Sequence, residues 1–140
     1  MPRKNNIRVV IDNNCWISFL IGRRLSNLVD MLSNERITLV ICNELLDELR
    51  DVTSRPKFVK YFKKEDVTSL MEFMQIIGES VEPQRPVNIC RDSSDDYLLA
   101  LAVEGDAQYL ITGDADLLVV KNIGSCQIID VNTFERMVIG

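Results

Sequence analysis

Short apolar runs alternate with longer amphipathic segments along the whole chain. Runs rich in β-branched residues predict strands at 7–11, 37–41, 108–112 and 127–129. Apolar residues at helical spacing predict helices around 15–21, 27–32, 44–53, 65–77, 94–104, 117–120 and 133–138. Residues 87–90 form either one more brief strand or the lead-in to the helix after them. Strands that alternate with helices indicate an α/β fold, with a mostly parallel sheet covered by helices on both faces.

Helix boundaries are expected at residues that cap helix ends. The expected N-terminal caps are Ser26 or Asn27, Asn43, Asp116 and Asn132. Glycines close three of the helices, at positions 22, 78 and 105. The 140 residues are expected to fold as one domain, 1–140, because no linker, repeat or low-complexity tract interrupts the pattern.

Composition excludes several classes of site. The chain has no histidine, which removes Ser-His-Asp and Cys-His mechanisms and His-ligated zinc. Its four cysteines form no C-x-x-C pair, so we expect buried free thiols in a reducing compartment. No apolar segment approaches the roughly 20 residues of a membrane span, and the N-terminus does not resemble a signal peptide. We therefore expect a cytoplasmic protein without a membrane partner.

Carboxylates follow two of the predicted strands. Asp12 comes directly after 7–11, and Asp114 comes two residues after 108–112. The carboxyl ends of parallel strands share one edge of a sheet, so these acids are expected to converge there. Each also has a simpler interpretation, because acids often serve as helix caps or turn residues. Asp116 is expected to cap the short helix that follows it.

Two further acids lie on or before predicted helices. Glu48 falls within an apolar stripe of its helix, where a carboxylate is costly unless it has a partner, such as a metal ion or a buried cation. Asp92, Asp95 and Asp96 precede an apolar helix, and acids in a first turn also complement the helix dipole. Periodicity cannot choose between Asp95 and Asp96. Crowded carboxylates need positive charge among them, and Mg²⁺ or Mn²⁺ is the usual occupant of an all-oxygen site.

The net charge of −5 hides a local excess of positive charge. Residues 54–64 contain five cations and no acid, interleaved with three aromatic residues. Cations beside aromatic rings suit single-stranded nucleic acid. The alternative is an amphipathic helix with aromatic residues in the core and lysines in water, and both interpretations can hold together. The candidate substrate-binding residues are Arg55, Lys57 and Lys60.

These motifs together resemble the PIN domain, in particular the bacterial group of toxin components of toxin–antitoxin systems. The resemblance runs from about residue 8 to 134 and rests on the segments around Asp12, Glu48, Asp96 and Asp114. It implies a three-layer α/β/α sandwich with a central, mostly parallel sheet, and Mg²⁺- or Mn²⁺-dependent cleavage of single-stranded RNA. It also implies a cognate antitoxin and a homodimer as partners.

Carried over by position, the four acids of the family fall on Asp12, Glu48, Asp96 and Asp114, which favours Asp96 over Asp95. These four are the expected catalytic and metal-ligating residues. Asn14, Thr112 and Asp116 are expected to orient them. The chain departs from the family pattern only at Asn13, where threonine is common, and that change leaves the four acids intact.

Two other interpretations remain. The main one is a non-catalytic PIN-like module that binds RNA or a protein. The second is a phosphoryl-transfer enzyme of the receiver or haloacid-dehalogenase type. Such enzymes need a second acid beside the first aspartate and a lysine after a late strand, whereas this chain has Asn13 and the segment 112–114 at those places.

Overall fold

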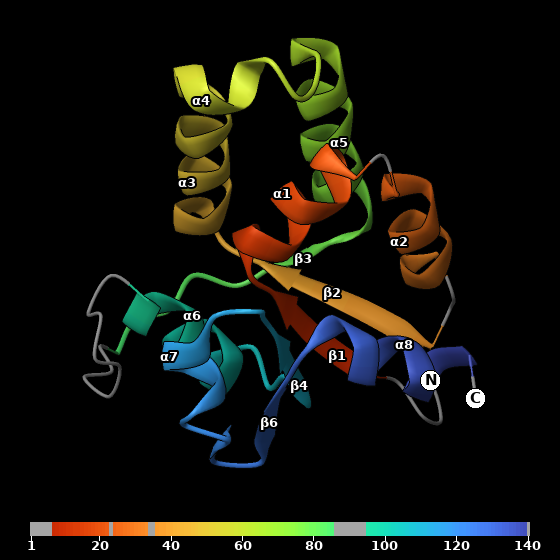
Figure 1. Ribbon diagram of the computed structural model, residues 1–140. Helices are drawn as coiled ribbons and strands as arrows, with labels where there is room; N and C mark the ends of the chain where they lie inside the picture. The colour runs from red at the N-terminus through yellow and green to blue at the C-terminus, as the bar shows by residue number, and fades with distance from the viewer. Residues whose placement is uncertain (1–6, 23, 34–35, 86–94, 140) are drawn as a thin grey trace.

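The computed structural model describes residues 7–22, 24–33, 36–85 and 95–139. Its strands are β1 (Ile7–Ile11), β2 (Ile37–Ile41), β3 (Glu79–Ser80), β4 (Tyr109–Ile111), β5 (Asn122–Ile123) and β6 (Cys126–Ile129). Its helices are α1 (Asn13–Ile21), α2 (Leu25–Leu32), α3 (Asn43–Thr53), α4 (Pro56–Val59), α5 (Lys64–Ile77), α6 (Asp96–Glu104), α7 (Ala115–Leu118) and α8 (Val131–Ile139). The expected alternation of strands and helices is confirmed (Figure 1).

The strands of the described residues form one six-stranded sheet in the order β3-β2-β1-β4-β6-β5. Every pair is parallel except β5 with β6, which is antiparallel. β1 lies between β2 and β4 inside the sheet. Its residues 9–11 are therefore almost fully buried, as expected for a strand covered on both faces. The register places Ile11 beside Ile111, so the residues that follow β1 and β4 emerge side by side.

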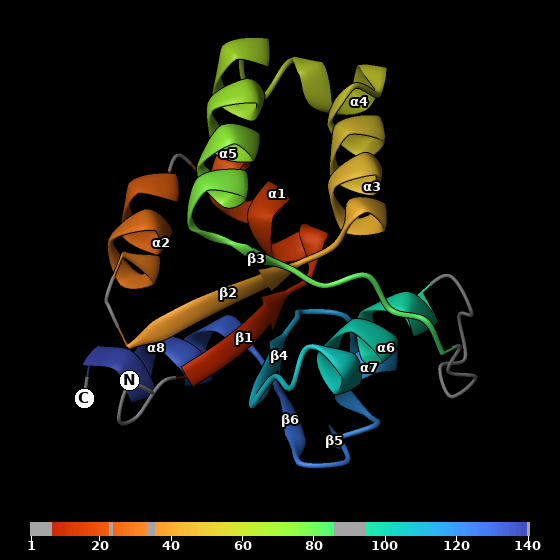
Figure 2. The same cartoon turned by 180° about the vertical axis from the view of Figure 1, so that it is seen from behind.

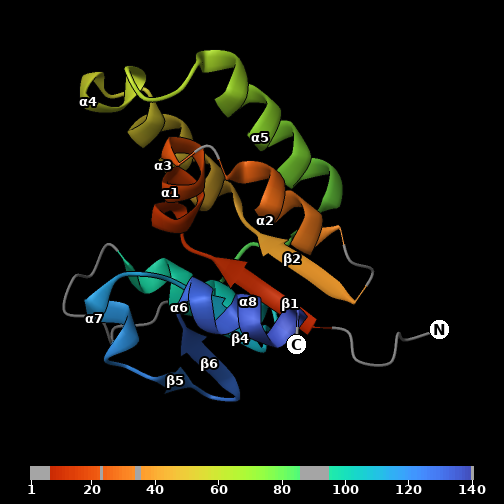
Figure 3. The ribbon, with the colours of Figure 1, turned by 45° about the vertical axis from the view of Figure 1, so that its right-hand side comes forward.

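Helices cover both faces of the sheet, which makes the three-layer α/β/α architecture. α6 contacts β1, β2 and β4, whereas α2 and α5 contact β2. Opposite views show α6 on one side of the sheet and α1, α2, α5 and α8 on the other (Figures 1 and 2). Figure 3 shows the same separation, with α8 in front of β1 and α6 behind it. No helix in the described part of the chain is long and apolar enough to cross a membrane.

α3, α4 and α5 form an arm that projects from the sheet (Figure 1). α3 starts directly after β2, and α4 lies at the far end of α3. α5 returns toward the sheet and contacts both α3 and β2. α3 therefore connects the carboxyl edge of the sheet to the tip of the arm.

Gly105 fixes the position of α6 on the sheet. A Cβ atom at this position would lie 2.7 Å from the Leu101 carbonyl oxygen and 2.7 Å from Cγ1 of Val40 on β2. Only a residue without a side chain allows this close approach. α6 ends at this position, where the chain turns into the start of β4. The other end of α6, with Asp96, therefore lies near the carboxyl edge of the sheet.

Four expected caps were wrong by one to three residues. α2 begins after Arg24 rather than after Ser26 or Asn27, and α3 begins after Cys42 rather than Asn43. α7 is capped by Asp114, not Asp116, and α8 begins before Asn132. The pattern places a helix near these positions but does not fix its first residue: Asp114 caps α7 with its side chain, whereas Arg24 and Cys42 precede their helices without a side-chain cap.

Two strands were not expected, namely β3 and β5. Each has two residues, too few to show any periodicity. The segment 87–90 lies outside the described residues, as do Cys90 and Asp92.

Candidate active site

Asp12 stands at the junction of β1 and α1. It is the N-cap of α1 and is 4 % exposed. Its Oδ2 accepts a hydrogen bond from the Thr112 hydroxyl at 2.8 Å, and its Oδ1 accepts one from the backbone N–H of Asn14 at 3.3 Å. Asp12 is thus both a helix cap and part of a polar network, so the simple and the functional interpretations of this residue coexist.

Thr112 connects Asp12 to Asp114. Its fully buried hydroxyl donates to Asp12 and accepts a hydrogen bond from the Asp114 backbone N–H at 3.0 Å. Asp114 in turn caps α7, where its Oδ1 accepts from the backbone N–H of Asp116 at 2.9 Å. Thr112 thus contacts Asp12 through its hydroxyl and Asp116 contacts Asp114 through its backbone amide, and their orienting roles stay predictions.

Glu48 joins three elements. Its Oε1 accepts hydrogen bonds from the Asn13 side-chain amide of α1 and from the Tyr97 hydroxyl of α6, each at 2.9 Å. The same amide of Asn13 also donates to the Leu45 carbonyl oxygen at 2.9 Å. The half-buried carboxylate of α3 therefore has fixed partners on two neighbouring helices.

Asp96 is the first residue of α6 and is 8 % exposed, whereas Asp95 beside it is half-buried. Asp96 directly precedes Tyr97, the residue that holds Glu48. The four acids thus belong to two linked pairs of segments: Asp12 with Asp114 through Thr112, and Glu48 with the start of α6 through Tyr97.

Burial and neighbouring charges control protonation in this cluster. Burial raises the pKa of Asp12, the hydrogen bonds from Thr112 and Asn14 lower it, and the negative charges of Glu48 and Asp114 raise it further. Burial followed by the charge of Glu48 raises the pKa of Tyr97, so its hydroxyl stays protonated and donates. Burial likewise raises the pKa of the Cys15 thiol to about 12, which makes it a poor nucleophile.

The donor set suits a hard divalent cation. Asp12, Glu48 and Asp114 form no ion pair with any lysine or arginine in the described part of the chain, although their charges act on one another. Among the described residues, no three acids or cysteines lie close enough to hold a metal ion by themselves. Mg²⁺ usually keeps several waters and takes only one or two carboxylates directly, so these acids fit a site completed by water.

Two residues of this network were not anticipated from the sequence. Neither Asn13 nor Tyr97 was expected to hold Glu48, since Asn13 was considered only for its departure from family patterns and Tyr97 lies in the helix predicted for 94–104. Asn13 is 2 % exposed, and its Oδ1 has no hydrogen-bond partner, so it leaves a buried oxygen beside the acids. The available signal was position, because Asn13 follows Asp12 and Tyr97 follows Asp96 directly.

Asn14 opens onto a cavity of about 700 Å³. Its side chain is exposed, and it donates to Asp12 through its backbone N–H. The cavity is also lined by Gly113, Asp114 and Arg24. One acid of the cluster is therefore accessible from a hollow wide enough for part of a substrate.

The lysine-rich segment, residues 55–64, lies at the tip of the arm and not among the acids (Figure 1). Arg55 forms an exposed ion pair with Asp51 at 3.1 Å. Lys57 and Lys60 lie over the rings of Phe58 and Tyr61, at 4.9 Å and 5.2 Å from the centroids.

The aromatic residues of this segment divide between the two interpretations. Phe62 is buried and Phe58 packs partly against the core, as an amphipathic helix predicts. Tyr61 is 47 % exposed and is available for stacking.

Comparison with known proteins identifies the family. The family model described as "PIN domain" matches residues 8–116. "Uncharacterized protein MJ1680" of Methanocaldococcus jannaschii is 30 % identical over 122 residues, which cover 85 % of this chain and 78 % of that protein. No solved structure matches significantly. PIN domains are generally nucleases and typically use divalent metals. The match includes the segments that carry all four acids, and the chain belongs to the PIN domain family.

Proposed function

We propose that this protein is an endoribonuclease that cleaves single-stranded RNA with Mg²⁺ or Mn²⁺ at Asp12, Glu48, Asp96 and Asp114. The observation that carries the proposal is the buried carboxylate of Asp12, on which the charges of Glu48 and Asp114 act without a cationic side chain to offset them. Such a cluster gains stability from a divalent cation, and family membership favours a nuclease.

The bound ion would supply an activated water and offset the negative charge of the scissile phosphate. The protein supplies orientation. Thr112 holds Asp12 through its hydroxyl and Asp114 through that residue's N–H, while Asn13 and Tyr97 hold Glu48. Contacts of this kind fix the direction of each ligand oxygen before substrate binds.

The single-stranded RNA is proposed to bind through cations on the arm. Arg55, Lys57 and Lys60 are exposed and lie at the end of α3 away from the acids. Positive side chains of this kind bind phosphates without reading sequence. Cleavage would then occur where the bound strand reaches the carboxyl edge of the sheet.

The resemblance also supports a role as the toxin of a toxin–antitoxin system, with a cognate antitoxin and a homodimer as partners. Cys15, Cys42 and Cys126 are buried free thiols, which supports the reducing environment of the cytoplasm. A non-catalytic PIN-like binding module is the second candidate, favoured by the spacing of the described acids, of which no three meet as a metal site.

The test is cleavage of a 5′-labelled single-stranded RNA with Mn²⁺, Mg²⁺ or EDTA. Asp12→Asn and Asp96→Asn should each lower the rate about 1,000-fold or more. Asp47→Asn, an exposed acid of α3 outside the cluster, serves as the matched control and should leave the rate unchanged. If wild type binds the RNA but cleaves it under no condition, the binding module becomes the better interpretation.

A further inference from the structure

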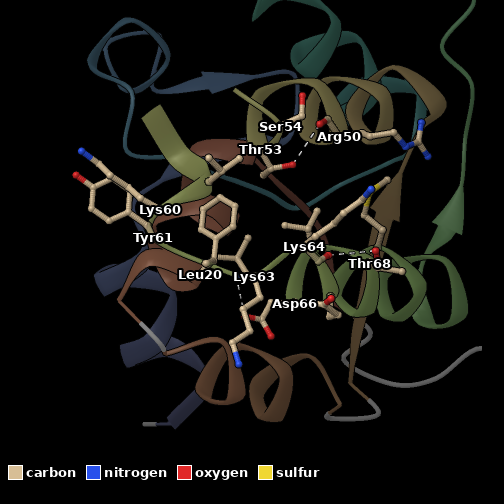
Figure 4. Close-up of a pocket in the computed structure, with 15 residues that line it drawn as sticks. Leu20, Arg50, Thr53, Ser54, Lys60, Tyr61, Lys63, Lys64, Asp66 and Thr68 are labelled. Atoms are coloured by element: carbon tan, nitrogen blue, oxygen red, sulfur yellow. Dashed lines mark hydrogen bonds between the residues drawn. The ribbon is translucent and has the colours of Figure 1, made fainter. Parts of the chain in front are cut away.

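A second and larger cavity lies within the arm, away from the acids. Its volume is about 1170 Å³, and residues of α3, α4 and α5 line it together with the end of α1 (Figure 4). Leu20, Phe62 and Met71 contribute buried apolar surface. Val59 and Tyr61 belong to the same lining and are 56 % and 47 % exposed. The cavity is thus apolar inside and carries exposed apolar side chains where it opens.

Cations surround this apolar cavity. Figure 4 shows Lys60 beside Tyr61 on one side, Arg50 and Lys64 on the opposite side, and Lys63 between them. Lys60, Lys63 and Lys64 make no ion pair with any residue in the described ranges.

Two acids, Glu65 and Asp66, also line the cavity. The carboxylate of Asp66 accepts a hydrogen bond from the backbone N–H of Lys63, which satisfies part of its hydrogen-bonding capacity within the protein. The three lysines are thus exposed without an ion pair in the described ranges, and the Lys60 ammonium lies over the Tyr61 ring, 5.2 Å from its centroid.

The cavity is connected to the acid cluster by two helices. α1 begins with Asn13, which holds Glu48, and its Leu20 lines the cavity seven residues later. α3 carries Glu48, and its Thr53 lines the cavity five residues later. Five residues of α-helix span roughly 7.5 Å. An extended polymeric ligand that is bound at the acids and follows α3 therefore reaches the cavity within a short distance.

We propose that this cavity binds a nucleobase of a single-stranded RNA, with the neighbouring phosphates on Lys60, Lys63 and Lys64. The inference rests on the proposed function and adds to it a base-binding position remote from the acids. Apolar walls and the exposed Tyr61 ring suit the faces of an unpaired base, and ammonium groups suit phosphates on either side of it. A duplex does not fit, because its bases are paired and stacked inside the helix.

The chemistry separates this ligand from an acidic peptide. A peptide with carboxylates and apolar side chains would also use the lysines and the apolar walls. A nucleic acid differs because it also bears flat aromatic bases, so removal of the bases at constant charge should weaken its binding. An oligoribonucleotide and an abasic strand of equal length isolate this difference.

The experiment measures binding by fluorescence anisotropy in EDTA, where the proposed metal-dependent cleavage is suppressed. The probes are a labelled single-stranded oligouridylate and the matching abasic ribose-phosphate strand, with a polyglutamate peptide as competitor. Thr68→Phe adds a ring at an exposed position of the cavity lining, and Lys60→Ala/Lys64→Ala removes two charges. Arg136→Gln removes an exposed cation of α8 and serves as the control.

Wild type should bind the base-bearing strand at least about fivefold more tightly than the abasic strand. Thr68→Phe should change that difference, because its ring either fills the cavity or stacks on the base; the double lysine variant should weaken the binding of both RNA strands, and Arg136→Gln should change neither. Circular dichroism of each variant confirms that it is folded.

Three results would overturn the proposal. If wild type binds the oligouridylate and the abasic strand equally, the cavity does not bind a base. Unchanged binding by Thr68→Phe and by the lysine variant would place RNA elsewhere. Tighter binding of polyglutamate than of RNA would identify a protein partner instead. Cleavage by wild type is measured in parallel with Mn²⁺ to keep the two hypotheses separate. If the cavity binds no base but the acids are the active site, wild type still cleaves RNA in Mn²⁺.

Discussion

The middle of α3 and the segment beyond its end have opposite character. Midway along the helix, Glu48 is half-buried, negatively charged and held by two side chains from neighbouring helices. Beyond its end, Arg55, Lys57 and Lys60 are exposed and positively charged; Arg55 makes a surface ion pair, and the two lysines lie over aromatic rings. One helix thus connects a preorganised cluster to an adaptable surface.

The difference follows from the cost of burial. A buried carboxylate without a partner is expensive, so the protein provides Asp12 and Glu48 with donors that fix their positions. An exposed lysine remains hydrated and needs no fixed partner. Substitutions in the cluster should therefore affect both stability and chemistry, whereas substitutions of the exposed cations Arg55, Lys57 and Lys60 should affect mainly binding.

The largest effect is expected from Thr112→Val, which keeps the shape of the side chain and removes its hydroxyl. Asp12 then loses a donor, and the Asp114 N–H loses an acceptor. The free energy of unfolding should fall by about 1.5–3 kcal/mol, and cleavage should slow about 100-fold. Urea denaturation and the RNA cleavage assay measure the two effects. Thr112→Ser retains the hydroxyl and should preserve most of both, and a valine variant as active as the serine variant would contradict this role.

Metal binding should stabilise the cluster by a comparable amount. Mn²⁺ at about 100 times its Kd adds roughly 2.7 kcal/mol to the free energy of unfolding, which raises Tm by on the order of 5–10 °C. The shift should disappear in Asp12→Asn and persist in Asp47→Asn. Differential scanning fluorimetry against metal concentration measures it, and an equal shift in all three proteins would place the ion elsewhere.

In EDTA the same carboxylate should produce a pH dependence of known sign. Burial raises the pKa of Asp12 in the folded state, so the folded protein retains this proton at a pH where the unfolded chain has lost it. The favourable contribution of the protonated group to stability is therefore lost as pH rises through the folded-state pKa. The Tm of Asp12→Asn relative to wild type should increase from about pH 4 to pH 7. A constant difference over this range would show that burial does not penalise the ionised form.

A smaller effect is expected from Tyr97→Phe, which removes one of the two donors to Glu48 and keeps the ring. Asn13 still holds the carboxylate, so kcat should fall about tenfold with little change in KM, and stability should fall by about 1 kcal/mol. Tyr109→Phe, a half-buried tyrosine of β4, is the matched control. If KM rises while kcat stays constant, Tyr97 contributes to RNA binding rather than to the position of Glu48.

The sequence predicted the fold better than it predicted the contacts. β1 and β2 were predicted at their observed bounds, since each is a short run of mainly β-branched apolar residues that is interrupted only once, by Arg8 in β1 and by Thr38 in β2. The four acids could be named because each lies where an element begins or ends, or within an apolar stripe. Their roles as ligands stay predictions.

The partners of these acids could not be predicted in the same way. Asn13 and Tyr97 reach Glu48 across 35 and 49 residues of sequence, and no local pattern reports such a contact. The arm shows a related limit, because the spacing of residues 55–64 does not reveal which aromatic residue is buried. Phe62 is buried and Tyr61 exposed because α4 ends at Val59 and the chain turns before α5.

The smallest effect on stability, and the clearest separation between Glu48 and the cations beyond α3, is expected from Arg55→Ala. Its ion pair with Asp51 is exposed on both sides, at 55 % and 71 %, so the free energy of unfolding should change by about 0.5 kcal/mol or less. Affinity for single-stranded RNA should fall at low salt, and the slope of log affinity against log salt should decrease by about one. Asp51→Ala tests the same site in the opposite direction, since it frees Arg55 from its partner and should strengthen binding. If both variants bind RNA as wild type does, Arg55 lies outside the path of the strand, and the lysines beyond it would have to bind the phosphates without it.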